Sequence, residues 1–410
     1  MSALGLVRAA AAHANGECGE LELAVAGSIE RAALALAQGM AERWGRSVWQ
    51  DGGGLGLAYP LDAAILEDAR RFAEVAAGDV RRNQCVDAVQ TAAQAAALRA
   101  CTAELDVALG KLAGILKQKA SAWAGLIKTG RTHLQDAAPL TLGQEVSGYL
   151  QQVRNARSRL GAAAEALRPV PLGRGCLGTG AGVPAKFAER AVRRLAELTG
   201  LPLQPSSHAL ADLAGAGALA FVHAALGAIA ASLFKVASDV ALLASGPVAG
   251  FNELRPPDTG LLCSALPGKT NPDAAEALVQ VCVQVIGADS AVRVAASQGQ
   301  FERNTYLPLL AYNVLRSAGL LSDAVEVFAR EGIAGLEPRR EVLGQNVANS
   351  VMLVTALAPH IGYDAAAKIA QDAYRRNLSL REAALASGRV DAATYDRLIR
   401  PERLLGPDDS

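Results

Sequence analysis

Apolar residues recur at three- and four-residue steps over long stretches of this 410-residue chain, the pattern of helices that bury one face. Good helix formers fill the same stretches. The pattern predicts helices over 22–43, 61–78, 86–125, 141–167, 185–199, 208–245, 273–297 and 304–330. Short strands are predicted only near 165–175 and within 341–410.

Several of these helices exceed the usual globular length of about 11–12 residues. Long apolar helices need partners along their whole length, which favours an all-α bundle that other subunits complete. One run, Leu213–Phe234, carries no charge and is long enough to span a membrane. It is mostly Ala and Gly, contains His223 and continues into Lys235, so a fully buried bundle helix is favoured over a membrane span.

Glycine and proline interrupt the helical pattern at 51–60, 168–184, 246–272 and 400–407. The third break lies between two long predicted helices. Loops of this length in compact domains are usually functional or disordered. The segment 246–272 is therefore the first place to look for a site.

Composition narrows the choice of partners. Lys plus Arg and Asp plus Glu both number 40, and this zero net charge argues against nucleic acid. The six cysteines form no CxxC pair and there are only five histidines, so neither a zinc site nor another cofactor site is indicated. Scattered thiols and an N-terminus without signal-peptide features predict a cytoplasmic protein.

Two polar segments could carry chemistry. The first, 128–136, joins two predicted helices and is either a ligand-facing turn or a set of helix caps. In the second, Lys269 and Asn271 point to one side of an extended chain and could hold a carboxylate. Alternatively Asn271 caps the next helix and Lys269 is solvated, while Glu276 favours the helix dipole. The glycines near 52–56 lack a nucleotide-binding signature.

These segments together resemble the fumarase/aspartase superfamily. KTGRTHLQDAAPLTLGQE (128–145) is similar to the family's KIGRTHLQDATPLTLGQE, and LCSALPGKTNPDAAE (262–276) to its GSSIMPGKVNPTQCE loop. PLGRGCLGTG (171–180) is similar to PLGGTAVGTG. The resemblance runs from a VWQ…G segment at 48–56 through FERNTYLPLLAYNVLRS (301–317) to NSVMLVTALAPHIGYDAAAKIAQDAY (349–374), so it covers nearly the whole chain.

The resemblance implies a β-elimination on a succinyl compound, in which a base removes a C–H proton next to a carboxylate and a group then leaves. It implies specific roles for six residues. Thr132 and His133 contact the substrate and leaving group, and Glu276 partners that histidine. Lys269 and Asn271 grip one carboxylate, and Ser264 donates to the aci-carboxylate intermediate.

Cys263 occupies the position of the family's serine base. A thiol near a cation can act as a base, although an inert thiol and a lost reaction are the alternative. The family's SSND segment, which binds the second carboxylate and the leaving group, reads Cys85-Val-Asp87-Ala here, and its GSGT threonine is Leu55. Asp87 could receive an amine or could simply favour a helix N-terminus.

From these departures we expect a C–N lyase acting on an atypical, amine-bearing succinyl-like substrate. The alternatives are a fumarase-like C–O hydro-lyase and a non-catalytic relative. The resemblance implies an N-terminal helical domain over 1–84, a central long-helix domain over 85–340 and a small helical domain over 341–410. It also implies a homotetramer with a multi-helix core, in which three subunits contribute the 85, 132 and 263 regions of each site.

Overall fold

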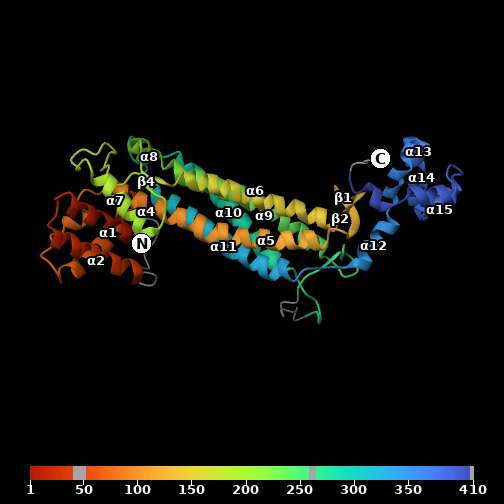
Figure 1. Cartoon of the computed structure of the whole chain (residues 1–410), viewed down its shortest axis with the longest axis horizontal. Helices are drawn as coiled ribbons and strands as arrows, with labels where there is room; N and C mark the ends of the chain where they lie inside the picture. The colour runs from red at the N-terminus through yellow and green to blue at the C-terminus, as the bar shows by residue number, and fades with distance from the viewer. Residues whose placement is uncertain (40–51, 258–264, 407–410) are drawn as a thin grey trace. The chain divides into compact units, whose positions relative to one another are not determined.

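The computed structural model describes residues 1–39, 52–257 and 265–406. Helices dominate these residues, as predicted, and the strands form only two-stranded pairs (Figure 1). The chain groups into two compact units, one comprising 1–110, 155–234 and 278–325, and the other 111–154, 235–277 and 326–410. The three predicted ranges, 1–84, 85–340 and 341–410, divide the chain differently and stay a prediction.

The first unit contains a cluster of shorter helices, four from the first 100 residues and two from 187–215. Arg8 is almost fully buried there and donates to Asp62 Oδ1 at 2.7 Å and to Gln84 Oε1 at 2.7 Å. This buried, paired guanidinium ties the first helix to the third. The helices of this cluster are α1 (Ser2–Glu17), α2 (Leu23–Gly39), α3 (Leu55–Ala69), α4 (Val86–Arg99), α7 (Phe187–Thr199) and α8 (Ala209–Gly215).

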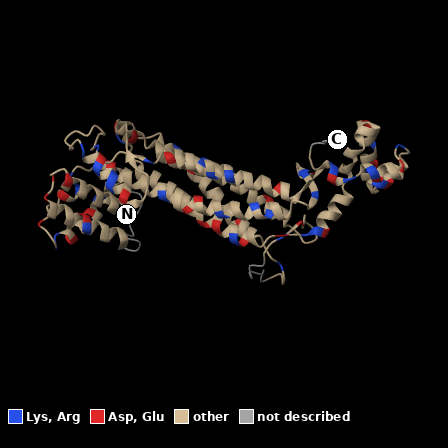
Figure 2. Cartoon of the chain, viewed as in Figure 1, with Lys and Arg blue, Asp and Glu red and all other residues tan. Residues whose placement is uncertain are grey.

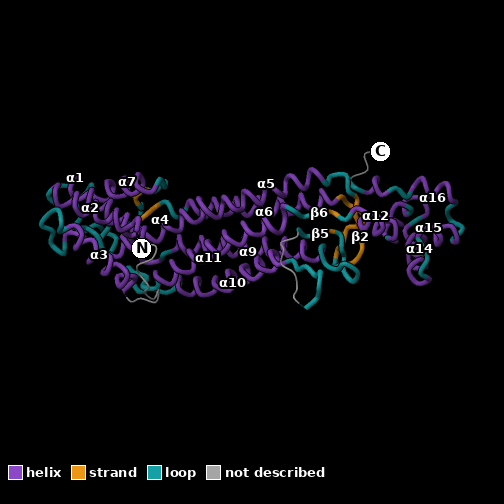
Figure 3. Tube along the Cα trace, turned by 90° about the horizontal axis from the view of Figure 1, so that it is seen from below, coloured by secondary structure: helices purple, strands orange, loops and turns teal. Residues whose placement is uncertain are grey.

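Five long helices cross from one unit into the other, because the boundaries between the units fall inside them (Figures 1 and 3). Two breaks were not predicted. A π-helical segment, Ala100–Leu105, separates α4 from the next helix. Ala216, with a left-handed φ of 47°, ends α8. The long helices are α5 (Asp106–Ala122), α6 (Leu142–Glu165), α9 (Gly217–Leu243), α10 (Asp273–Ala296) and α11 (Leu307–Val327).

The second unit contains a β-hairpin and a C-terminal helical cluster. Strands β1 (Ile127–Thr132) and β2 (Gln135–Thr141) pair antiparallel. Leu353, Leu357 and Ile369 belong to the buried core of the cluster. Its helices are α12 (Arg340–Asn349), α13 (Ala358–Ile361), α14 (Tyr363–Arg376), α15 (Leu380–Ala386) and α16 (Ala392–Leu398).

The strand predictions had mixed outcomes. β3 (Pro169–Val170), paired with β4 (Gln204–Pro205), confirms the strand predicted near 165–175. No strand lies within 341–406, so that prediction was wrong; β6 (Glu337–Pro338) ends before it and pairs with β5 (Leu254–Arg255). The hairpin at 127–141 was missed because its polar sequence lacks the alternation of a half-buried strand.

The long helices leave much apolar surface uncovered. Among the described residues, α9 and α10 are long and apolar enough to cross a membrane, a test that core helices of soluble proteins also pass. Only 39% of the most apolar window of α9 is buried in the single chain, so the full burial of this helix in a bundle completed by other subunits stays a prediction. Figure 2 shows Lys and Arg residues interspersed with Asp and Glu residues along the chain.

Candidate active site

Thr132 and His133 lie at the tip of the β1–β2 hairpin. Thr132 pairs with Gln135, which leaves His133 and Leu134 as a two-residue turn. Both have a left-handed φ, 55° and 61°, as a type I′ turn requires. Such turns favour Asn and Gly, so a histidine and a leucine here carry backbone strain. The turn exposes the His133 side chain, as a residue that contacts substrate must be.

A buried ion network holds the base of this hairpin. Lys128, 1% exposed at its side chain, reaches Glu145 at 2.7 Å and Glu253 at 2.8 Å. Arg131 reaches the other oxygen of Glu253 at 2.7 Å, and Asn346 donates to that oxygen at 3.1 Å. Burial alone would raise the pKa of Glu253, but Arg131 and Lys128 outweigh it and hold the pKa below its ordinary value.

Lys269, Asn271 and Glu276 belong to the same unit as the hairpin. Lys269 is exposed and its Nζ donates to Asn271 Oδ1 at 2.5 Å, so the predicted pair does share one side of the chain. Glu276 is exposed in the first turn of α10. Among the described residues, no hydrogen bond or ion pair joins these three to His133. Cys263 and Ser264 lie outside the described residues.

Asp87 lies inside the fold and binds backbone groups. Its side chain is fully buried, and its carboxylate accepts from the backbone N–H groups of Cys85, Ala88, Gly173, Arg174 and Gly175 at 2.7–3.1 Å. Burial raises the pKa of this carboxyl, and the backbone hydrogen bonds oppose that shift. The predicted role of Asp87 as a receptor for an amine is therefore corrected: it binds the backbone of its own chain.

Sequence reasoning missed two neighbours of Cys85. Cys176 Sγ donates to Cys85 Sγ at 2.8 Å, and Arg303 Nη2 donates to it at 3.6 Å. Nothing in the sequence pairs these positions, because Cys176 is 91 residues and Arg303 is 218 residues from Cys85. Only the tertiary structure brings them together.

A second constellation resembles a hydrolase triad but cannot act as one. His223 lies 3.1 Å from Asp289 and 3.0 Å from Ser317. Its side chain is 0% exposed, so no substrate reaches it. Burial lowers the pKa of His223, and Asp289 opposes the shift. These three residues satisfy one another inside the helical bundle.

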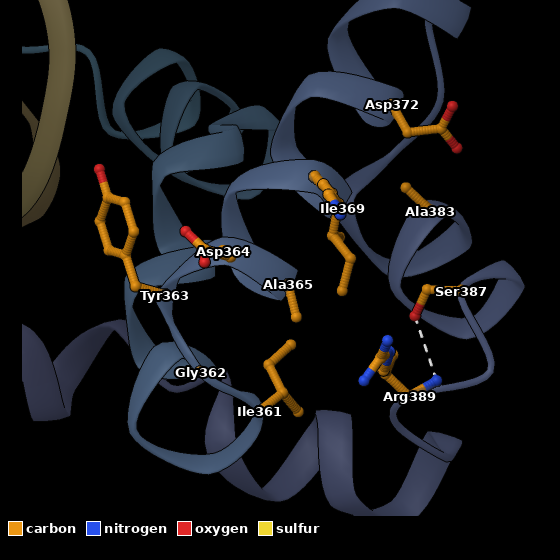
Figure 4. Close-up of a pocket in the computed structure, with 11 residues that line it drawn as sticks. Ile361, Gly362, Tyr363, Asp364, Ala365, Ile369, Asp372, Ala383, Ser387 and Arg389 are labelled. Atoms are coloured by element: carbon orange, nitrogen blue, oxygen red, sulfur yellow. Dashed lines mark hydrogen bonds between the residues drawn. The ribbon is translucent and has the colours of Figure 1, made fainter.

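Two cavities lie away from the predicted site residues. One of about 620 Å³ is formed by α14, α15 and the turns beside them, with Asp364, Asp372 and Arg389 in its lining (Figure 4). Another, of about 610 Å³ and mostly apolar, lies between α1, α4 and α11. Asn271 lines only a cavity of about 20 Å³. No three His, Cys, Asp or Glu side chains of the described residues are placed to hold a metal.

Comparison with known proteins covers the whole chain. A family model described as lyase matches residues 4–287, and one for the fumarase C C-terminus matches 353–406. A class II fumarate hydratase of Thermosynechococcus vestitus is 41% identical over 98% of this chain and 89% of its own. One from Ralstonia nicotianae is 43% identical over 88% of this chain and 80% of its own.

Solved structures agree. A class II fumarase from Schistosoma mansoni superposes with a TM-score of 0.96 at 29% identity, covering all of this chain and 91% of the other. A protein from Brucella melitensis described as fumarate lyase:delta crystallin gives a TM-score of 0.92 at 32% identity, covering 99% and 90%.

These relatives overturn the expected C–N lyase with an atypical amine-bearing substrate. The relatives at about 40% identity over nearly the full chain are named for hydration, a C–O chemistry. The expectation of a C–N lyase depended on Asp87 facing the leaving group. In the structure the Asp87 carboxylate instead accepts hydrogen bonds from backbone N–H groups. Sequence, fold and motif order agree that this chain is a lyase and belongs to the fumarase/aspartase superfamily.

Proposed function

We propose that this protein is a hydro-lyase that adds water reversibly across the double bond of fumarate. The carrying observation is the 41% identity over 98% of the chain with a protein named class II fumarate hydratase. The adjacent Lys269 and Asn271 add chemical support, since an ammonium and an amide together can hold a substrate carboxylate.

In the dehydration direction, a base takes the C–H proton next to one carboxylate and the resulting aci-carboxylate is stabilised by hydrogen-bond donors. We assign proton removal to Cys263 and donation to Ser264, from the family resemblance alone. Lys269 and Asn271 hold the carboxylate that gains charge. Thr132, His133 and Glu276 act on the hydroxyl group, which leaves as water.

The remaining substrate carboxylate needs donors of its own. In the family, the segment that begins at the position of Cys85 binds this second carboxylate. In this chain Arg303 donates a hydrogen bond to the Cys85 sulfur. The Arg303 guanidinium is well suited to binding a carboxylate. It could therefore replace the hydrogen-bond donors of the family's SSND segment that the sequence of this chain lacks.

We propose a homotetramer whose active sites combine segments of three subunits. The uncovered apolar surface of α9 and α10 supports this assembly: Phe221 is 53%, Val283 56% and Val294 62% exposed. Separate subunits would also explain why, among the described residues, no hydrogen bond or ion pair joins His133 to Lys269 within one chain. The free thiols support a reducing, cytoplasmic location.

The test is a substrate panel on the purified chain, with fumarate in water alone and with ammonia, and with loss of the double bond read by ultraviolet absorbance. Hydration is expected, with no product from ammonia. Lys269→Gln should lower kcat/KM by about 100-fold or more, because an unpaired substrate carboxylate costs roughly 3 kcal/mol. Lys117→Gln, at another exposed lysine, is the matched control.

Cys263→Ala should abolish hydration, whereas Cys263→Ser restores the base of the family and should retain it. Equal activity of wild type and Cys263→Ala would remove the thiol from the mechanism. Absence of turnover on fumarate, with a folded protein, would contradict the hydro-lyase and favour a non-catalytic relative.

A further inference from the structure

Two cysteines far apart in sequence meet in the first unit. Cys85 directly precedes α4, and Cys176 lies in the glycine-rich loop between β3 and α7. Their sulfur atoms are 2.8 Å apart, the only sulfur–sulfur contact among the described cysteines. A disulfide bond is about 2.05 Å long, so a small movement of either side chain would close one.

The backbone holds these two positions together. The Asp87 carboxylate accepts from Cys85 N with one oxygen, at 2.7 Å, and from Gly175 N with the other, at 3.1 Å. One buried carboxylate therefore ties the residue before α4 to the neighbour of Cys176. The meeting of the thiols is a consequence of this clamp rather than of loose surface side chains.

The pair is accessible and the two thiols are not equivalent. Cys176 is exposed and Cys85 is half-buried. Cys176 donates its S–H to Cys85, which with burial raises the pKa of Cys176 to about 11. Cys85 is the acceptor and also receives a hydrogen bond from Arg303 at 3.6 Å. This arrangement leaves the Cys85 sulfur as the atom that attacks an oxidant, with Cys176 as the second thiol.

We propose that Cys85 and Cys176 are a redox modification site, in which a peroxide converts the two thiols reversibly into an intramolecular disulfide.

The reaction balances with hydrogen peroxide as the oxidant. The Cys85 sulfur, having lost its proton, attacks one peroxide oxygen; the O–O bond breaks, giving a sulfenic acid and hydroxide. The hydroxide takes the Cys176 proton and becomes water. The Cys176 sulfur then attacks the Cys85 sulfur, and the S–O bond breaks with release of a second water after proton uptake. Two thiols lose two electrons, and peroxide gains them.

The effect on activity rests on the proposed function. Cys85 begins the segment assigned to the second substrate carboxylate, and a disulfide would remove a hydrogen-bonding thiol there and pin the 171–180 loop to α4. Oxidation is therefore expected to lower fumarate hydration, and a dithiol reductant such as dithiothreitol should restore it.

The chemical test uses the full chain and does not depend on activity. The protein is treated with hydrogen peroxide, remaining thiols are alkylated, and disulfide-linked peptides are identified by non-reducing mass spectrometry. A peptide joining Cys85 to Cys176 should form and disappear on reduction. Cys18 is the matched control, since it is half-buried and accepts from Arg190 at 3.4 Å but has no sulfur neighbour among the described residues.

The Cys176→Ser variant separates the outcomes. It should form no linked peptide and should stop at a sulfenic acid on Cys85, detected by a dimedone probe. The proposal is overturned if peroxide links Cys85 to Cys176 no more often than it links Cys18 to other cysteines. Repeating the disulfide mapping in the Cys263→Ser variant excludes a contribution of the Cys263 thiol to the linked peptides.

Activity is measured last, so that the two proposals fail separately. Formation of the disulfide, together with a several-fold loss of hydration activity in the wild type but not in Cys176→Ser after peroxide treatment, would support both the modification site and its effect on catalysis. If the disulfide forms in a protein without hydratase activity, the modification site stands and the proposed function is wrong. Full activity of the disulfide form would overturn the effect on catalysis alone.

Discussion

The Asp87 carboxylate lies inside the fold, surrounded by the N–H groups of two segments. An isolated buried carboxylate is costly, but backbone hydrogen bonds from Cys85, Ala88 and the 173–175 turn compensate for that cost. An acidic side chain in a substrate-binding segment can thus belong entirely to the architecture.

Asp87→Asn tests this role. The asparagine amide keeps one acceptor oxygen and turns its NH₂ group toward backbone donors, so we expect the unfolding free energy to fall by about 2–4 kcal/mol. Denaturant midpoints measure the loss. Asp391→Asn, which alters an exposed cap of α16, should cost much less. If the denaturant midpoint of Asp87→Asn equals that of the wild type and its substrate preference changes, Asp87 belongs to the substrate-binding site and the structural role is wrong.

At the scale of elements, the β1–β2 hairpin depends on the ion network beneath it. Lys128, Arg131 and Asn346 all meet the buried Glu253, which precedes β5. Breaking a buried ion pair by removing one partner costs about 3–5 kcal/mol, because the other charge stays buried. The ion pairs of Lys128 and Arg131 therefore stabilise the strand that leads into the strained turn at His133 and Leu134.

The network predicts a pH dependence. The pKa of Glu253 in the folded protein lies below its ordinary value of about 4.5, so the unfolded state binds more protons as pH falls. The stabilisation from Glu253 is fully present above about pH 4.5 and is lost as pH falls through the folded pKa. In Glu253→Gln, the denaturant midpoint should be lower at pH 7 and should fall less steeply below pH 4.5. Parallel curves for both proteins would contradict this assignment.

At the scale of the whole molecule, the apolar faces of α9 and α10 are not covered by other parts of the same chain. Their exposed valines and phenylalanine would face water in a monomer. The zero net charge adds no long-range repulsion between copies. These properties favour burial of the same faces against other copies of this chain.

Val283→Asp should therefore weaken assembly. A carboxylate on the exposed face of α10 would have to be desolvated in the interface, which shifts the equilibrium toward smaller species. Light scattering coupled to size-exclusion chromatography measures the mass in solution. Val248→Asp, at a 93% exposed loop position, is the control and should leave the mass unchanged. If Val283→Asp also leaves the mass of wild type unchanged, the proposed interface is wrong.

The sequence by itself determined the fold class and the family. Three- and four-residue apolar spacing predicts helices wherever one face is buried, and the ordered motifs from 128–145 to 262–276 identify the lyase superfamily. It also predicted the adjacency of Lys269 and Asn271, because residues two apart in extended chain share a side. These features depend on neighbours in sequence.

The tertiary structure decided what depends on distant contacts. The hairpin at 127–141 is held by Glu253 and Asn346, which no local pattern connects to it. Asp87 changed from a candidate ligand to a buried clamp because N–H groups 86–88 residues away reach it. The same clamp brings Cys176 to Cys85. Whether a polar side chain serves a substrate or the backbone depends on which donors surround it, and folding alone brings those donors together.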